Sequence, residues 1–273
     1  MYLTVNNNTH NAYTFKSTRQ RVTDELGRVV NCHYANFNRA DVSWKDLVML
    51  LRDRFLYLNK VKVNMFGCSD ASDGYTFIIY LKKYLGELAS KFLPLEASDI
   101  STEIIEKAKK GEILLHDKDL QFLKSMEAQD LFVRDYEKPV ETMRGIDFYP
   151  YKVKPELRKC INFSVKDVRT EAAKNDFSDE VFMFRNGWTF IDLESQNEVV
   201  KNLSKHSNPL SLFMIGQSDL FKSNACEFFQ RNSFRGIESD VFTRAETDYP
   251  SNTIGMPKEK SKFPEFILFE KNQ

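Results

Sequence analysis

The sequence is poor in glycine and has no excess of charge of either sign. It holds ten glycines in 273 residues, and none are spaced as in the G-x-G-x-x-G dinucleotide fingerprint. Lysine plus arginine and aspartate plus glutamate both number 39, so the net charge is zero. Without a net field to attract phosphate backbones or anionic lipids, binding to nucleic acid or to a membrane surface is not expected.

Long apolar runs and cysteine pairs are missing as well. No stretch reaches the length of about 18 apolar residues that a membrane span requires. The first residues, MYLTVNNNTHNAYTF, lack the basic and apolar segments of a secretory signal. The four cysteines form no C-x-x-C pair, and the four histidines are equally scattered. A metal site is therefore not expected, and reduced thiols in a cytoplasmic protein are the simplest interpretation.

The chain does have a globular composition, with 42% hydrophobic residues and 23 phenylalanines. Its most informative stretch is 61–111. An apolar strand at 61–66 leads through the turn GCSDAS into a helix at about 72–88, and a second strand at 92–97 leads to Asp99 and a further helix. This alternation predicts a nucleotide-type ligand at the carboxyl edge of a parallel sheet. At the tip of the second strand, Asp99 can accept both hydroxyls of a ribose; alternatively, it only caps the next helix.

The remaining stretches divide into three kinds. Ser43 and an apolar stripe after it predict an earlier helix, whose apolar face belongs to the core. Residues 112–160 break the alternation and predict short strands rich in basic and aromatic residues, which form either a docking surface for an acidic protein or a solvated sheet face. Residues 217–262 are polar and predicted to be irregular. The strands at 212–215 and 266–269 are predicted to form an antiparallel pair at the edge of the sheet.

Several motifs, in the same order, resemble those of the CheR chemotaxis receptor methyltransferases. GCSDASDGYTFIIYL resembles the family's GCSTGEEPYSLAI segment, and LEASDISTEIIEKAKKGEI resembles its A-T-D-I-D…A-x-x-G-x-Y segment. FMFRNGWTFID resembles C-R-N-x-x-I-Y-F-D, LFMIGQSD resembles L-F-L-G-H-S-E, and PEFILFEK resembles the last strand. ANFNRAD matches T-x-F-F-R-D in part and keeps Arg39. The match runs from about residue 33 to residue 271, and its specificity comes from several motifs in register.

The resemblance implies an S-adenosylmethionine-dependent methyltransferase that releases S-adenosylhomocysteine. It also implies an α/β fold: the doubly wound, seven-stranded, mostly parallel sheet of class I, Rossmann-like methyltransferases, with a small antiparallel β-subdomain inserted. The expected division is an N-terminal arm and lead-in helix at 1–58 and a cofactor-binding domain at 59–273, with the insert at about 114–160. The family's N-terminal helical domain is expected to be shortened here. Because the insert can dock a receptor tail in the family, the expected partner is a protein substrate such as a chemoreceptor.

The same resemblance, carried over position by position, assigns residues to two groups. The residues assigned to the cofactor are Phe66, Gly67, Cys68, Asp73, Asp99, Ile100, Asp167, Val168, Arg185 and Asn186. The residues assigned to the methyl group and its acceptor are Arg39, Arg134 and Phe190. Asp167 and Val168 replace the family's Asn-Leu pair that flanks the adenine, and Phe190 stands where the family has a tyrosine. In the turn, Ala71 replaces a glycine.

Methyl transfer to a carboxylate requires few catalytic groups from the protein. Methyl transfer from a sulfonium is an in-line displacement, so the protein must align donor and acceptor and exclude water. A glutamate acceptor, with a reference pKa of about 4.3, is already ionised near neutrality and needs no general base. An arginine can orient its carboxylate, and Arg39 and Arg134 are the candidates.

Three functions remain open from the sequence. The first is a CheR-like O-methyltransferase for glutamate side chains of a chemoreceptor or another protein. The second is a degenerate regulatory protein that binds S-adenosylmethionine or S-adenosylhomocysteine without turnover, because the tyrosine is replaced at Phe190. The third is a methyltransferase for a different acceptor, including a small molecule.

Overall fold

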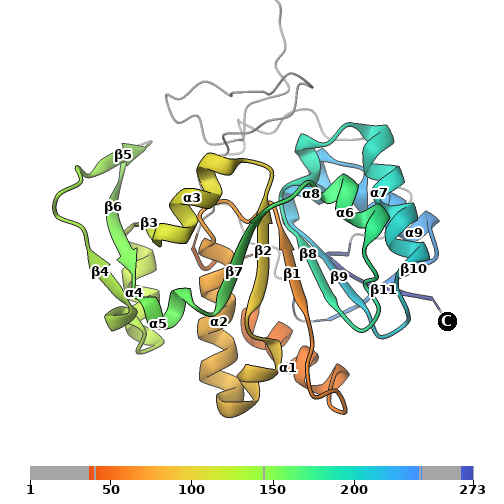
Figure 1. Cartoon of the computed structure of the whole chain (residues 1–273), viewed down its shortest axis with the longest axis horizontal. Helices are drawn as coiled ribbons and strands as arrows, with labels where there is room; N and C mark the ends of the chain where they lie inside the picture. Colours follow the sequence, from red (N-terminus) through yellow and green to blue (C-terminus); the bar gives the residue numbers. More distant parts are fainter. Residues whose placement is uncertain (1–36, 40, 144, 240, 242–265, 273) are drawn as a thin grey trace, which may run out of the picture.

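The computed structural model describes residues 37–39, 41–143, 145–239, 241 and 266–272, so the expectations for residues 1–36 lie outside it. The described residues form two sheets with their helices (Figure 1). In chain order the elements are α1 Trp44–Arg54, β1 Val63–Phe66, α2 Ser72–Leu85, η1 Gly86–Phe92, β2 Leu95–Asp99, α3 Thr102–Lys110, β3 Glu112–Leu115, α4 Asp117–Ser125, η2 Gln129–Leu131, β4 Phe132–Arg134, β5 Glu141–Met143, β6 Ile146–Val153, α5 Pro155–Arg158, β7 Ile161–Val165, α6 Val168–Lys174, β8 Val181–Phe184, η3 Trp188–Phe190, α7 Leu193–Lys205, β9 Leu212–Ile215, α8 Gln217–Lys222, α9 Ala225–Arg231, β10 Phe234–Gly236 and β11 Leu268–Lys271.

The larger sheet has seven strands in the order β10-β11-β9-β8-β1-β2-β7. The five strands from β9 to β7 run parallel, and β11 is antiparallel to both of its neighbours. Every residue of β1, β8 and β9 is buried, because helices cover both faces of the sheet. This is the doubly wound, mostly parallel α/β fold predicted from the sequence.

The local signals in the first half of the chain predict the helices well. Ser101 caps α3 by accepting a hydrogen bond from the Ile104 amide, and Gly111 ends the helix in a left-handed conformation. Asp99 is the last residue of β2, as predicted. Leu47 and Leu51 of α1 are fully buried, which confirms that its apolar stripe belongs to the core.

Two predictions for the last third of the chain are wrong. The antiparallel pairing of β9 with β11 is confirmed, but β11 is not at the edge, because β10 pairs with its other side. The stretch predicted to be irregular contains α8, α9 and β10. The reason is an aromatic cluster. The ring centroids of Phe229 and Phe234 are 5.0 Å apart, and those of Phe234 and Phe213, in β9, are 4.8 Å apart. Such tertiary contacts stabilise short elements whose own sequences are mostly polar.

The second sheet is antiparallel, with β6 pairing to β3, β4 and β5. It is built from residues within 112–153 and lies between α3 and β7 in the chain. The inserted β-subdomain is expected at about the same place, 114–160. Aromatic rings hold it against α2: Phe132 of β4 lies 6.4 Å from Tyr75, and Phe122 of α4 lies 5.6 Å from Tyr80. In Figure 1 this sheet stands at the flank of the larger one, beside α2 and α3.

None of the helices in the described part of the chain combines the length and the apolar character needed to cross a membrane.

Candidate functional site

The turn after β1 is held in an unusual backbone conformation. Gly67, Ser69 and Ala71 all have positive φ angles, of 61°, 52° and 65°. At Gly67 a Cβ atom would also come within 2.8 Å of the Phe184 ring, so no other residue fits without a shift. A left-handed conformation costs a residue with a side chain about 1–2 kcal/mol. Strain of this kind concentrates at functional sites, and here it shapes the turn that joins Phe66 and Cys68 to α2.

Asp99 lies beside this turn. Its two carboxylate oxygens accept hydrogen bonds from the Ser69 amide (3.1 Å) and the Ser101 amide (3.0 Å). Burial raises the pKa of Asp99 above its ordinary value, although the amides that it accepts from act in the opposite direction. Ser101, not Asp99, is the cap of α3. Each oxygen of Asp99 keeps a further lone pair, so the carboxylate can still accept hydroxyl donors.

The residues assigned to the adenine lie next to Asp99. β7 pairs with β2 so that Val165 is opposite Asp99, and the amide of Lys166 donates to the Asp99 carbonyl at 3.0 Å. Asp167 then caps α6 by accepting from the Arg169 amide, and it pairs with the Arg169 guanidinium at 2.6 Å. Val168 is buried. Two adjacent parallel strands thus deliver an acidic residue and an apolar residue to the same edge, as the sequence predicts.

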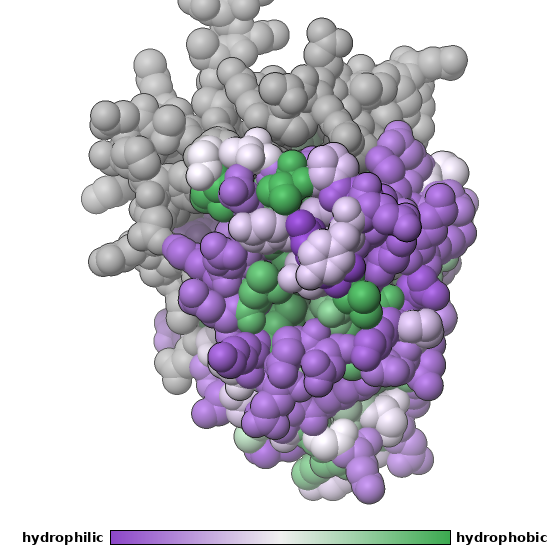
Figure 2. Space-filling model, turned by 90° about the vertical axis from the view of Figure 1, so that its left-hand side faces the viewer, coloured by the Kyte–Doolittle hydropathy of each residue, from purple (hydrophilic) through white to green (hydrophobic). Residues whose placement is uncertain are grey.

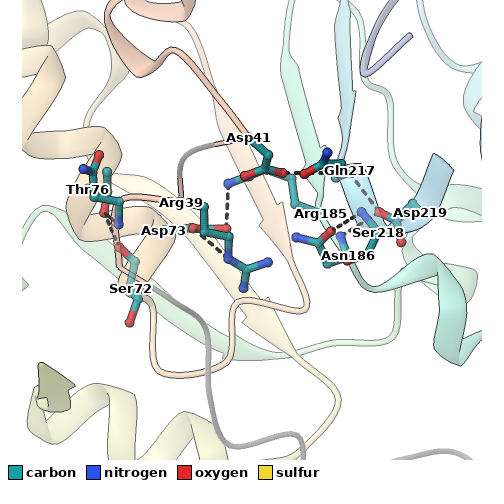
Figure 3. Close-up of polar contacts among 12 residues, drawn as sticks. Arg39, Asp41, Ser72, Asp73, Thr76, Arg185, Asn186, Gln217, Ser218 and Asp219 are labelled. Carbon is teal, nitrogen blue, oxygen red and sulfur yellow. Dashed lines mark hydrogen bonds and ion pairs between the residues drawn. The ribbon is translucent and has the colours of Figure 1, made fainter. Parts of the chain in front are cut away.

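A cluster of charged side chains lies at the carboxyl end of β8 (Figure 3). Arg185, which directly follows β8, donates through Nη1 to Oδ2 of Asp73 (2.8 Å) and through Nη2 to Oδ1 of Asp41 (2.9 Å). Its guanidinium also stacks over the Trp44 ring, 4.9 Å from the centroid. The Nε atom of Arg39 lies 3.6 Å from Oδ1 of Asp73, the oxygen to which Arg185 does not donate. We call these four charged residues, Arg39, Asp41, Asp73 and Arg185, the carboxyl-end cluster.

Asp41 is the member of this cluster that the sequence analysis missed. It was present in the partly matched ANFNRAD motif, two residues after Arg39. Burial by itself would raise the pKa of Asp41, but Arg185 and Arg39 outweigh it and hold that pKa below its ordinary value. Burial likewise disfavours the charged form of Arg185, while Asp73 and Asp41 raise its pKa. Asp41 and Arg185 are therefore both charged near neutral pH.

The cluster leaves buried polar atoms unpaired. Among the described residues, Oδ1 of Asp73, Nε of Arg39 and Nε of Arg185 are buried and have no hydrogen-bond partner. A buried polar group without a partner costs about 1–3 kcal/mol. The two atoms that face each other, on Asp73 and Arg39, form an acceptor and a donor at the carboxyl edge of the sheet.

A second buried carboxylate fixes the turn after β8. Asp219, fully buried at the start of α8, accepts from the amides of Asn186 (2.6 Å), Gly216 (2.9 Å) and Trp188 (3.1 Å). Burial raises the pKa of Asp219 to about 7, against the effect of these amides. The Asn186 side chain accepts from the Ser218 amide at 2.9 Å. Asp219 was also missed, although it ends the LFMIGQSD motif.

The last two candidate residues have contacts outside this cluster. Arg134 lies on β4, donates to the Pro150 carbonyl at 2.8 Å and stacks over the rings of Tyr149 and Tyr151. All of these partners belong to the second sheet. Phe190 ends η3, and its amide donates to the Gly187 carbonyl at 3.0 Å. A catalytic role for either residue stays a prediction.

Comparison with known proteins agrees with this geometry. The strand order, the strained turn after β1 and the acidic residue ending β2 define a class I methyltransferase. The family model described as "CheR methyltransferase, SAM binding domain" matches residues 47–237, so the chain belongs to the CheR methyltransferase family. Its cofactor is S-adenosylmethionine.

Individual relatives are distant. A chemotaxis protein methyltransferase of Borreliella burgdorferi is 21% identical over 167 residues, which cover 61% of this chain and 54% of the relative. The chain thus spans about half the length of the curated relative that it matches. A magnesium protoporphyrin IX methyltransferase from Synechocystis, solved with bound S-adenosylmethionine, is 13% identical over 74% of this chain and 73% of its own, with a TM-score of 0.36. A TehB-like methyltransferase from Corynebacterium glutamicum is 10% identical over 85% and 89%, with a TM-score of 0.42.

The described residues fit the cofactor in chemical terms. The amino-acid end of S-adenosylmethionine carries an ammonium, and Asp73 Oδ1, which has no hydrogen-bond partner among the described residues, offers an acceptor for it. Asp99 supplies a carboxylate for the ribose at the neighbouring strand end. No group of three or more histidine, cysteine, aspartate or glutamate side chains in the described part of the chain could hold a metal ion.

Proposed function

We propose that the protein is an S-adenosylmethionine-dependent O-methyltransferase. Its proposed acceptors are ionised carboxylates of another protein, such as those of glutamate side chains. The observation that carries this proposal is Arg39 at the carboxyl edge of the sheet: its Nε has no hydrogen-bond partner among the described residues and lies 3.6 Å from Oδ1 of Asp73. An arginine in this position can hold an acceptor carboxylate by charge-assisted hydrogen bonds. A carboxylate acceptor is already ionised near neutral pH and needs no general base.

Each residue then has a role in binding or orientation. When bound, S-adenosylmethionine supplies an electrophilic methyl group for in-line displacement. The turn at Phe66, Gly67 and Cys68 would line its binding site. Asp99, followed by Ile100, would accept the ribose hydroxyls, and the pair of Asp167 and Val168 would flank the adenine.

We assign the binding of the charged, amino-acid end of the cofactor to the carboxyl-end cluster. Oδ1 of Asp73 would accept the ammonium, and Arg185 and Asn186 would support the edge of the site. With these contacts made, Arg39 is left to orient the acceptor. The main catalytic contribution of the chain is then alignment and exclusion of water, which can account for a large part of such a rate enhancement.

The second sheet is the proposed docking surface for the protein substrate. Its face is shown in Figure 2, where apolar side chains are exposed among polar ones. Val133, Tyr136 and Ile146 are among the exposed large apolar residues of this sheet and its loops. Arg134 adds a cation stacked on tyrosines, which suits an acidic segment of a partner such as a chemoreceptor. A docking surface at the flank, away from the cofactor turn, favours a macromolecular acceptor over a small one.

A second candidate function follows from Phe190. In the family a tyrosine stands here, and the loss of one hydroxyl that stabilises a transition state can slow a reaction by about ten- to a thousandfold. The alternative is therefore a regulatory protein that binds S-adenosylmethionine and S-adenosylhomocysteine without turnover. A cytoplasmic location stays a prediction from the scattered cysteines.

Two measurements on the full chain separate these candidates. Calorimetric titration with S-adenosylhomocysteine should show binding with a stoichiometry of one, and incubation with labelled S-adenosylmethionine and candidate proteins should yield base-labile methyl groups. Binding without any transfer would remove the proposed activity. Phe190→Tyr is expected to raise transfer by about ten- to a hundredfold if the wild-type chain is a slow enzyme. Activity that appears only in Phe190→Tyr would identify the wild-type chain as the regulatory protein.

A further inference from the structure

A short segment before α1 crosses the carboxyl edge of the larger sheet. We call residues 37–39 and 41–43 the strap. The Asn38 amide donates to Thr76 Oγ1 of α2 at 3.0 Å, and the Ser43 amide donates to the Val241 carbonyl at 2.8 Å. Between them, Asp41 accepts from the Gln217 amide at 3.2 Å, at the start of α8. The strap therefore ties α2 to α8 across the carboxyl-end cluster (Figure 3).

Both carboxylate oxygens of Asp41 accept hydrogen bonds. Asp41 is 6% exposed, and its two oxygens accept from different donors: Oδ1 from Arg185 and Oδ2 from Gln217. Arg185 is divided in the same way, with Nη2 on Asp41 and Nη1 on Asp73. Each terminal nitrogen of Arg185 therefore binds a different carboxylate, and the guanidinium links Asp41 to Asp73.

The way in which Arg185 is shared decides what Asp73 can do. An arginine beside a single carboxylate favours a bidentate arrangement, in which two nitrogens bind both oxygens. Here Asp41 takes one of the two nitrogens, so Asp73 receives only one, on Oδ2. Its Oδ1 has no hydrogen bond among the described residues, and its nearest cation, Nε of Arg39, is 3.6 Å away, beyond hydrogen-bond distance. Oδ1 is the atom to which the proposed function assigns the ammonium of the cofactor.

We infer that Asp41 is a positioning residue that keeps Oδ1 of Asp73 open for a ligand ammonium by holding half of the Arg185 guanidinium away from it. This inference rests on the proposed binding of the amino-acid end of the cofactor by Asp73. Without the negative charge at position 41, Arg185 turns toward Asp73, pairs with both of its oxygens and competes with the ammonium.

The test compares two ligands, of which only one carries the ammonium. Asp41→Asn keeps the shape of the side chain and removes its charge. We expect it to weaken S-adenosylhomocysteine binding about tenfold, the scale of one charged hydrogen bond. Binding of 5′-methylthioadenosine, which lacks the amino-acid end, should stay within about twofold. Asp53→Asn, an exposed aspartate on α1 paired with Arg52, is the matched control and should change neither affinity.

Other outcomes overturn the inference. If Asp41→Asn weakens both ligands equally, the role of Asp41 is only structural. If it weakens neither, Asp41 does not act on the site. In the Asp73→Asn background, Asp41→Asn should cause no further loss of S-adenosylhomocysteine affinity, and additive losses would contradict the mechanism. If Asp41→Asn does not fold, Arg185→Lys offers a second route, because a single ammonium cannot serve both carboxylates; it should also weaken only the ligand with the amino-acid end. Wild-type protein that binds neither ligand would instead refute the proposed site.

Discussion

Two arginines, one at each end of the larger sheet, differ in how many of their nitrogens are hydrogen-bonded. Arg54, at the end of α1, donates to Glu270 Oε2 and to the carbonyls of Pro209, Leu210 and Ser211, just before β9 begins. Arg185 lies at the opposite edge, just after β8. All three nitrogens of Arg54 donate hydrogen bonds. In the cluster, by contrast, Nε of Arg185, Nε of Arg39 and Oδ1 of Asp73 have no hydrogen-bond partner among the described residues.

The difference is consistent with a structural role for Arg54 and with the proposed binding role of the carboxyl-end cluster. A group that serves only stability is expected to be fully hydrogen-bonded, because an unpaired buried polar atom costs about 1–3 kcal/mol. The amino-end arginine meets this expectation. The carboxyl-end cluster does not, and Oδ1 of Asp73, which lacks a hydrogen bond among the described residues, is the atom that the proposed ligand ammonium would bind. Three substitutions test this comparison, in order of their expected effect on stability.

Arg185→Met should have the largest effect. It leaves Asp41 and Asp73 buried without their shared counter-charge, and breaking a buried ion pair costs about 3–5 kcal/mol. The free energy of unfolding, measured by urea denaturation, should fall by that amount, and S-adenosylhomocysteine binding should be lost. A loss of less than about 1 kcal/mol would mean that the two carboxylates are not held by Arg185.

Arg54→Met should have an intermediate effect on stability and none on the ligand. It removes the ion pair with Glu270 and three hydrogen bonds to carbonyls, at a cost of about 1–3 kcal/mol. Glu270 keeps its contact with Arg235, which limits the damage. At a temperature where the variant is folded, calorimetry should give the wild-type dissociation constant for S-adenosylhomocysteine. A loss of affinity greater than about threefold would show that the two edges of the sheet are coupled.

Arg39→Gln should have the smallest effect on stability. Its guanidinium lies 3.6 Å from Asp73 and is partly exposed, and such pairs contribute about 0–1 kcal/mol. Transfer of base-labile methyl groups should nevertheless fall by at least about tenfold, because the acceptor loses a charge-assisted contact. Transfer at the wild-type rate would remove Arg39 from the acceptor site and leave Arg134 as the remaining candidate.

Much of the site could be predicted because its residues lie in order at strand ends. Gly67, Asp99, Asp167 and Arg185 each follow or end an apolar run, and parallel strands bring such positions to one edge. The same logic fails for Asp41 and Asp219. Asp41 follows no predicted strand, and Asp219 lies in the stretch after the strand at 212–215 that is predicted to be irregular. Asp41 binds an arginine far away in the chain, and Asp219 binds backbone amides.

The boundary between sequence and structure follows from the range of the forces involved. Apolar periodicity, capping residues and motif order are local properties, and by themselves they determined the parallel α/β core, the place of the cofactor turn and the family. The existence of α9 and β10 depended on phenylalanine contacts with β9, and the division of Arg185 between Asp41 and Asp73 depended on three segments that meet only in the folded chain. Long-range packing and electrostatic competition decide those features, and no local pattern in the sequence encodes them.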